Sequence, residues 1–245
     1  MKIDLLLPVC VVACLACGHT EAGPPGPAAV APSAAQPAPT RQSHMQTSFM
    51  RATQIRDAII AGDLEGAKAA AEEFNAEDHY AVMPEDWKGW IERVRQHAGE
   101  VALASDLGAA AQGLASMALA CGNCHHHTKQ GPATGEQEAL GHPERAAPDL
   151  ATRMQRHQVA TDELWLGLLG PSDALWKQGT VTLTRAEMVA PMKEGEPVDG
   201  YVASEVESVR TDATAARAAE THVGRAESYG NLLARCAGCH SYLRR

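Results

Sequence analysis

The chain has 245 residues, a formal net charge of −9 at pH 7 and 4% aromatic residues, with two Phe in total. The acidic balance argues against binding of nucleic acid and leaves solubility, or docking to a basic partner, as the use of the charge. The scarcity of aromatic side chains leaves little bulky apolar material for a core. A chain of this length forms one large domain or two small ones.

The first 17 residues are typical of a bacterial secretory signal, with one positive charge at Lys2 and a short apolar run over residues 5–16. The run is too short to span a membrane as a helix. Small residues precede both Cys14 and Cys17, as in lipoprotein signals, in which the cysteine becomes the acylated N-terminus. After cleavage before Cys17, each of the four cysteines that follow Cys17 in the mature chain belongs to one of two C-x-x-C pairs. We therefore expect a lipid anchor to the membrane at Cys17, with Cys14 second and an ordinary secretory signal as the alternative.

Residues 18–43 are rich in Ala, Pro and Gly, and include the runs Gly23–Pro27 and Gln36–Pro39. Such a composition cannot bury enough apolar surface to fold by itself. We expect a disordered tether that extends by about 3 Å per residue in the polyproline conformation. It would hold a folded part, beginning at residue 44, away from a membrane surface.

Four helical segments are predicted between residues 44 and 128. The first places apolar residues at helical spacing and ends at Gly62. Asp63 and Asp106 are expected to cap the second and fourth segments, and Trp87 opens the third. Because short loops join the segments, an antiparallel four-helix bundle is the simplest arrangement. The segments cover residues 44–61, 63–74, 87–101 and 106–125.

The fourth segment ends in the motif C-x-x-C-H, and a second copy lies near the C-terminus. This spacing is the attachment signature of c-type haem, in which two thiols add to the porphyrin vinyl groups and the adjacent imidazole becomes the proximal iron ligand. Two copies predict two covalently attached haem c groups, whose porphyrins would supply apolar volume that the aromatic residues do not. The attachment residues are Cys121, Cys124, Cys236 and Cys239, and the proximal ligands are His125 and His240.

A four-cysteine zinc site is the alternative for the two C-x-x-C pairs. Each pair is followed directly by a histidine, and an export signal is expected, so haem attachment is favoured. Cys14 and Cys17 also have C-x-x-C spacing, but Gly18 stands where the histidine is needed. No third haem site is therefore expected.

Residues 129–148, rich in Gly, Pro and charge, are expected to link the first bundle to a second, residues 149–245. Asp149 is expected to cap the first helix of this half, and Thr180–Thr184 favours an extended conformation. The last two helices are expected at 201–219 and 222–243. Aligned without a gap, the halves form an internal repeat that pairs Met45 with Met154, Gln46 with Gln155, Ile55 with Leu164, Ile59 with Leu168, Ile60 with Leu169 and Lys68 with Lys177.

Each half resembles cytochrome c′ and its six-coordinate low-spin relatives. The likenesses are Ala61–Glu65 between the first two segments, Trp87 at the start of the third, Ala104–Leu107 before the fourth, and the C-x-x-C-H motif that closes it. The resemblance covers residues 44–128 better than 149–245. It implies an all-α fold of two tandem antiparallel four-helix bundles, each with C-x-x-C-H at the end of its fourth helix.

The same resemblance directs attention to the distal side of each iron. Cytochrome c′ leaves this position open to diatomic gases, whereas its low-spin relatives place there a methionine from the first helix. In an antiparallel bundle the start of the first helix lies beside the end of the fourth. Met45 and Met154 match across the repeat, although a methionine at such a position also suits packing. His157 lies one turn beyond Met154, where an imidazole would bind iron well. Met45, Met154 and His157 are therefore the distal candidates, with His44 and Met50 also in range.

The remaining histidines are not expected to bind metal. His222 begins the last helix, about 27 Å from His240 at 1.5 Å per residue, which is too far to touch the haem of its own helix. His126 and His127 point to other faces of their helix than His125, and His97 flanks an apolar stripe.

Together these features predict an exported dihaem c-type cytochrome that carries electrons by outer-sphere transfer between redox partner proteins of the cell envelope. The expected location is the periplasm or outer cell envelope, with a lipid anchor in a bacterial membrane. Since no nucleophile–base arrangement or phosphate loop is found, electron transfer is favoured over enzymatic catalysis. The alternatives are gas binding or small-molecule redox chemistry at a five-coordinate haem, and a bundle that keeps its haems only for stability.

Overall fold

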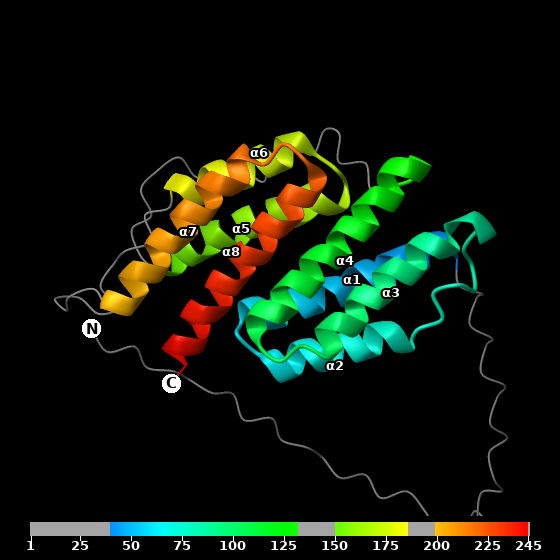
Figure 1. Cartoon of the computed structure of the whole chain (residues 1–245), viewed down its shortest axis with the longest axis horizontal. Helices are drawn as coiled ribbons and strands as arrows, with labels where there is room; N and C mark the ends of the chain where they lie inside the picture. The colour runs from blue at the N-terminus through cyan, green and yellow to red at the C-terminus, as the bar shows by residue number, and fades with distance from the viewer. Residues whose placement is uncertain (1–39, 132–149, 186–198, 245) are drawn as a thin grey trace, which may run out of the picture. The chain divides into compact units, whose positions relative to one another are not determined.

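The computed structural model describes residues 40–131, 150–185 and 199–244, and all regular structure within these ranges is helical. Figure 1 shows the helices in chain order, from α1 in blue to α8 in red. The all-α prediction is confirmed, whereas the signal peptide, most of the tether and most of the linker lie outside the described residues. The elements are α1 (Arg41–Ile60), α2 (Leu64–Ala76), the 3-10 helix η1 (Glu85–Trp87), α3 (Lys88–Ala102), α4 (Leu107–Thr128), α5 (Leu150–Leu169), α6 (Asp173–Arg185), α7 (Gly200–Ala218) and α8 (His222–Leu243).

The helix starts follow from local capping residues. Asp63 and Asp106 cap α2 and α4 as predicted, and the Asp106 side chain accepts a hydrogen bond from the backbone N–H of Ala109 at 2.8 Å. α1 begins three residues earlier than expected because Thr40 and Ser43 form a reciprocal capping box. The cap expected at Asp149 lies outside the described residues.

Thr180–Thr184, expected to be extended, is helical and belongs to α6. Leu175, Trp176, Gly179, Thr180 and Leu183 are buried at helical spacing, so tertiary packing overrides the β propensity of the threonines. Their hydroxyls donate to carbonyls one turn earlier, those of Lys177, Gln178 and Val181, which is a common way to satisfy a threonine within a helix.

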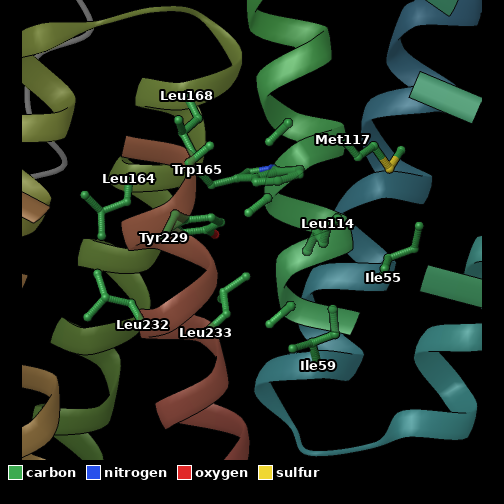
Figure 2. Close-up of a cluster of buried hydrophobic side chains, with 14 of the residues drawn as sticks. Ile55, Ile59, Leu114, Met117, Leu164, Trp165, Leu168, Tyr229, Leu232 and Leu233 are labelled. Carbon is green, nitrogen blue, oxygen red and sulfur yellow. The ribbon is translucent and has the colours of Figure 1, made fainter. Parts of the chain in front are cut away.

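The buried apolar side chains form one cluster to which both halves of the chain contribute. Figure 2 shows its centre, where Trp165 from α5 points toward α4. Consecutive helices pack on each other from α1 to α4 and from α5 to α8, and α4 packs against α8. α1 also contacts α8, and α4 also contacts α5. The two halves of the chain therefore pack against each other.

A buried ion pair joins the halves next to this cluster. The guanidinium of Arg56, on α1, is 4% exposed and lies 2.8 Å from a carboxylate oxygen of Asp57 and 2.8 Å from one of Asp162 on α5. It also lies 5.8 Å from the ring centre of Trp165, which stacks on Tyr229 of α8 at 6.0 Å. α1, α5 and α8 therefore meet around one buried charge.

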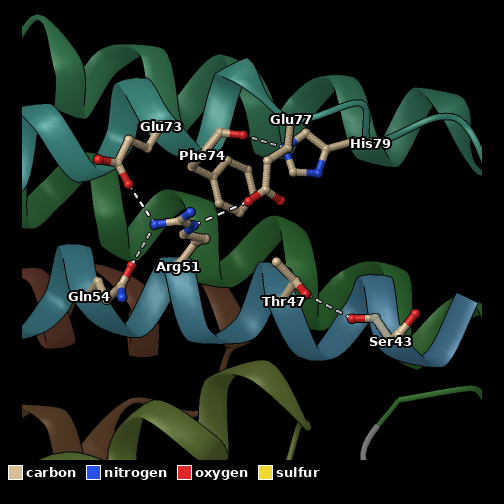
Figure 3. A network of polar contacts seen from close by, with 8 residues as sticks. All are labelled: Ser43, Thr47, Arg51, Gln54, Glu73, Phe74, Glu77 and His79. Carbon is tan, nitrogen blue, oxygen red and sulfur yellow. Dashed lines mark hydrogen bonds and ion pairs between the residues drawn. The ribbon is translucent and has the colours of Figure 1, made fainter. Parts of the chain in front are cut away.

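Polar contacts fix α1 against α2 on the other side (Figure 3). Arg51 of α1 pairs with Glu73 at 2.5 Å and with Glu77 at 3.2 Å. His79, 4% exposed, lies with Nε2 2.5 Å from the carbonyl of Phe74. Within the described ranges, no helix combines the length and the apolar character needed to cross a membrane.

Candidate functional site

The two C-x-x-C-H motifs lie in the closing turns of α4 and α8. Residues three and four apart on a helix share a face. The spacing therefore places Cys121, Cys124 and His125 on one side of α4, and the corresponding residues on one side of α8. The predicted position of each motif, near the end of a long helix, agrees with the structure.

The cysteine side chains have the same pattern of burial in both motifs. None of the four described cysteines forms a disulfide. Burial, with a smaller effect of the neighbouring cysteine, raises the pKa of Cys121 and of Cys236 to about 12. Burial also raises the pKa of Cys124 and Cys239, which are half-buried. All four cysteines are partly buried, and burial raises the pKa of the first cysteine of each motif most, so both thiols of each motif are neutral at pH 7.

The four-cysteine zinc site would need the two C-x-x-C pairs to lie together, although they belong to different helices, α4 and α8. In the part of the chain that the structure describes, no three His, Cys, Asp or Glu side chains gather in a way that would hold a metal ion. Within the described residues, the two C-x-x-C pairs are therefore not gathered into one cluster.

The histidine that follows each pair is oriented by a backbone carbonyl. Nδ1 of His125 lies 2.7 Å from the carbonyl oxygen of Leu169, and Nδ1 of His240 lies 2.6 Å from that of Ile60. Since a carbonyl only accepts, Nδ1 carries the proton and the lone pair is on Nε2. Burial also lowers the pKa of His125, against the opposing effect of its hydrogen bond. A neutral imidazole with Nδ1–H held in place is the form that binds iron, so the residues fit a covalently attached haem.

The distal candidates differ in their surroundings. His157 lies close enough to His240 for their charges to interact, and burial, followed by His240, lowers the pKa of His157 to about 4. Met154 is partly buried on the same helix. Met45 is 36% exposed and Met50 57%. Met45, Met154 and His157 as iron ligands therefore remain predictions.

The start of α1 does lie beside the end of α4, as the bundle argument requires. The guanidinium of Arg41 donates to the side-chain oxygen of Gln130 at 3.1 Å. His44 follows on α1, and its ring lies 5.3 Å from that of His79 in an edge-on contact. Nε2 of His44 is buried without a hydrogen-bond partner.

His222 is a site residue that the sequence analysis missed. Its Nε2 lies 2.9 Å from the carbonyl oxygen of Leu168, and its Nδ1 lies 3.1 Å from Oδ1 of Asn123, inside the first motif. Distance along its own helix correctly separates His222 from His240, but it gives no information on the other half. His222 reaches Asn123 because it lies in the first turn of α8 and α8 packs against α4.

His97 and His127 contact residues outside the two C-x-x-C-H motifs. His97 bonds to Glu100 on its own helix at 2.8 Å. His126 and His127 are exposed, and the ring of His127 lies 5.8 Å from that of Trp90.

Comparisons with protein families, with curated proteins and with solved structures found no match. One surface depression is lined by Tyr80, Lys88, Gly89 and Glu92, which include no motif residue. The chemistry of the two motifs, rather than a likeness or a pocket, therefore indicates what the molecule does.

Proposed function

We propose that this chain is an exported dihaem c-type cytochrome that carries electrons by outer-sphere transfer. In this proposal α1–α4 and α5–α8 are two tandem four-helix bundles, each with one haem c at the end of its fourth helix. Two features of the helices support the repeat, since α4 and α8 both have 22 residues and the last residues of α1 and α5, Ile60 and Leu169, match in the alignment of the halves.

The observation that carries the proposal is the matching arrangement of the two motifs. Each has two partly buried cysteines, a first cysteine whose pKa burial raises to about 12, and an imidazole whose Nδ1 lies against a backbone carbonyl oxygen. Chance cysteines or a single metal site would not repeat all three features. Attachment of the same group at both motifs explains the repetition.

The protein residues would anchor and orient the cofactor. The thiols of each motif would hold the porphyrin covalently, and Nε2 of His125 or His240 would face the iron. The haem, when bound, supplies an iron that changes between the ferric and ferrous states. The surrounding helices would exclude water and set the distance over which an electron passes to a redox partner protein of the cell envelope.

At the second motif we assign His157 as the distal ligand. Its imidazole is partly buried and near enough to His240 for their charges to interact, and burial lowers its pKa to about 4, which leaves a lone pair for iron at neutral pH. Met154, one turn earlier, is the alternative there. A haem with two imidazole ligands would be low-spin and suited to electron transfer.

At the first motif a second function has specific support. In the alignment of the two halves, Ser48 stands where the second half has His157. Met45, the other distal candidate, is 36% exposed. An open iron position that binds a diatomic gas or a small redox substrate is therefore the alternative at this site. Exposure of the reduced protein to carbon monoxide separates the two, since rapid binding at the first haem would exclude Met45 as a ligand.

Haem stoichiometry tests the main proposal. The chain is expressed with a c-type haem attachment system, and covalent haem per chain is measured after denaturation. We expect two haems for the wild type and one for each double variant, Cys121→Ser with Cys124→Ser or Cys236→Ser with Cys239→Ser. No covalent haem in the wild type, or zinc in its place, would contradict the proposal.

The proposed location is tested separately. We expect the mature chain to carry a lipid on Cys17 and to sediment with membranes, and Cys17→Ser to release it to the periplasm. Retention of the lipid in Cys17→Ser would assign the anchor to Cys14. A wild-type chain without lipid would contradict the anchor but not the haem proposal.

A further inference from the structure

Each proximal histidine is held by the opposite half of the molecule. His125, on α4, is bound to the carbonyl of Leu169 on α5, and His240, on α8, is bound to the carbonyl of Ile60 on α1. Ile60 and Leu169 occupy the same place in the repeat and are the last residues of their helices. The two contacts are therefore reciprocal.

The accepting carbonyls belong to helix C-terminal turns. The last four carbonyls of a helix have no partner within it, and this end carries a partial negative charge. An imidazole whose N–H points at such a charge is a stronger electron donor to a bound metal. It therefore favours the ferric over the ferrous state of an iron bound at Nε2.

A glycine permits close approach at each of the two contacts. A Cβ on Gly122, within the first motif, would lie 2.2 Å from the carbonyl oxygen of Leu168. A Cβ on Gly62, in the turn after α1, would lie 2.3 Å from Oγ of Ser241 and 2.9 Å from the carbonyl oxygen of Ala237. Real Cβ atoms essentially never come within 3.0 Å of another heavy atom, and at each glycine one of the close atoms is a backbone carbonyl oxygen, so an alanine there must shift the two halves relative to each other.

We infer that the two haem sites are cross-braced, in that the last turn of α1 positions His240, the last turn of α5 positions His125, and each half sets the redox potential of the haem attached to the other. Ile60, Leu169, Gly62 and His222 act as positioning residues in this arrangement. The inference rests on the proposed haem attachment for its redox consequence, but the contacts themselves do not depend on it.

The first test uses the full chain without haem. The ring Nδ1–H protons of His125 and His240, protected by their hydrogen bonds, are observed by NMR with nitrogen-15 in the histidine rings. We expect Gly62→Ala to weaken or remove the His240 signal and to leave that of His125 in place. An unchanged His240 signal would overturn the inference, whether or not the chain is able to attach haem.

The second test uses the chain with both haems in a redox titration, with the two potentials assigned from the double cysteine variants. Gly62→Ala lies in the half that attaches the first haem, yet we expect it to increase the ferrous-to-ferric ratio of the second haem severalfold at a fixed applied potential. The first haem should be unchanged. A shift confined to the first haem, or no shift at either, would contradict cross-bracing.

The matched control is Gly89→Ala on α3, where an added Cβ meets no atom within 4 Å. It is the same substitution in the same half, and we expect neither haem to respond. A response equal to that of Gly62→Ala would show a nonspecific effect and overturn the inference.

The mirror variant is His222→Gln, which keeps the claim testable if Gly62→Ala fails to fold because of the left-handed backbone at Gly62, where φ is +71°. His222 lies on the helix that attaches the second haem but contacts Asn123 and Leu168 at the first motif. We expect His222→Gln to shift the first haem and to leave the second unchanged. The opposite result would contradict the inference.

Discussion

The two motif sites are alike on one side and different on the other. Their thiols have the same burial, and their histidines are oriented by equivalent carbonyls. They differ in that the second half has the partly buried imidazole of His157 where the first half has Ser48. In the proposal, the C-x-x-C-H spacing would determine the proximal side of each iron, and the first helix of each half would determine the distal side. The two haem sites would then share their proximal side and differ on the distal side.

Replacement of the distal candidate should produce the largest difference between the sites. We expect His157→Ala to convert the second haem from low-spin to high-spin and to open it to rapid carbon monoxide binding, because the iron loses an imidazole ligand. Ser48→Ala, at the matching position, should change neither haem. Ferric spectra and stopped-flow carbon monoxide binding measure both. A low-spin spectrum that survives in His157→Ala would transfer the assignment to Met154.

The ion pair of Arg56 with Asp162 joins the two halves of the chain. Arg56→Ala removes a side chain that is 5% exposed and leaves the partly exposed Asp162 carboxylate without a partner, so we expect a loss of about 1–3 kcal/mol in the free energy of unfolding. Arg51→Ala, which removes the more exposed pairs with Glu73 and Glu77, should cost less than about 1 kcal/mol. Denaturant titration of the two variants compares them. Equal losses would show that Arg56 does not act as a buried charge.

In the haem-free chain, His157 at the second site should make the free energy of unfolding depend on pH. The pKa of His157 is about 4 in the folded state against 6.5 as its ordinary value. Between these values the unfolded chain binds a proton that the folded chain does not, so stability is full above pH 6.5 and is lost as the pH falls toward 4. The loss approaches about 3 kcal/mol, from 1.36 kcal/mol per pKa unit.

Denaturant titrations at pH 7 and pH 4.5 measure this loss. His157→Gln has no titrating group at this position, so the part of the loss due to His157 should disappear. A pH dependence identical to that of the wild type would refute the assignment of the shift to His157.

The smallest effect concerns the glycine within the first motif. Gly122→Ala places a methyl against the carbonyl of Leu168 and should cost about 1–3 kcal/mol by overpacking. Gly238→Ala is the matched change in the second motif, where the nearest atom, the hydroxyl of Tyr201, would lie 3.5 Å away. We expect it to cost less than about 0.5 kcal/mol. Thermal unfolding compares the two variants, and a larger loss in Gly238→Ala would reverse the comparison.

Local chemistry was sufficient to predict a large part of this structure. The all-α fold and the caps at Asp63 and Asp106 are confirmed, and the residues of the two motifs lie in the closing turns of α4 and α8. In each case the signal lies within one turn of the residue concerned. The first helix begins at Arg41 rather than at residue 44, because Thr40 caps it although the surrounding Ala- and Pro-rich composition predicts disorder.

Non-local packing accounts for what the sequence did not reveal. The β-branched run Thr180–Thr184 is helical because α6 buries one of its faces. His222 lies too far along α8 to reach the motif at the end of its own helix, but the packing of α8 on α4 brings it to Asn123 in the other motif. The crossed hydrogen bonds of His125 and His240 depend on how the two halves pack, and no spacing within either half encodes that.

A redox titration of the wild-type chain, followed by visible absorption, tests the central claim most directly. The proposal predicts two reversible one-electron steps at different potentials, because two haems with unlike distal surroundings accept electrons independently. A chain with no reversible haem reduction would contradict the assignment of this protein as a dihaem electron carrier.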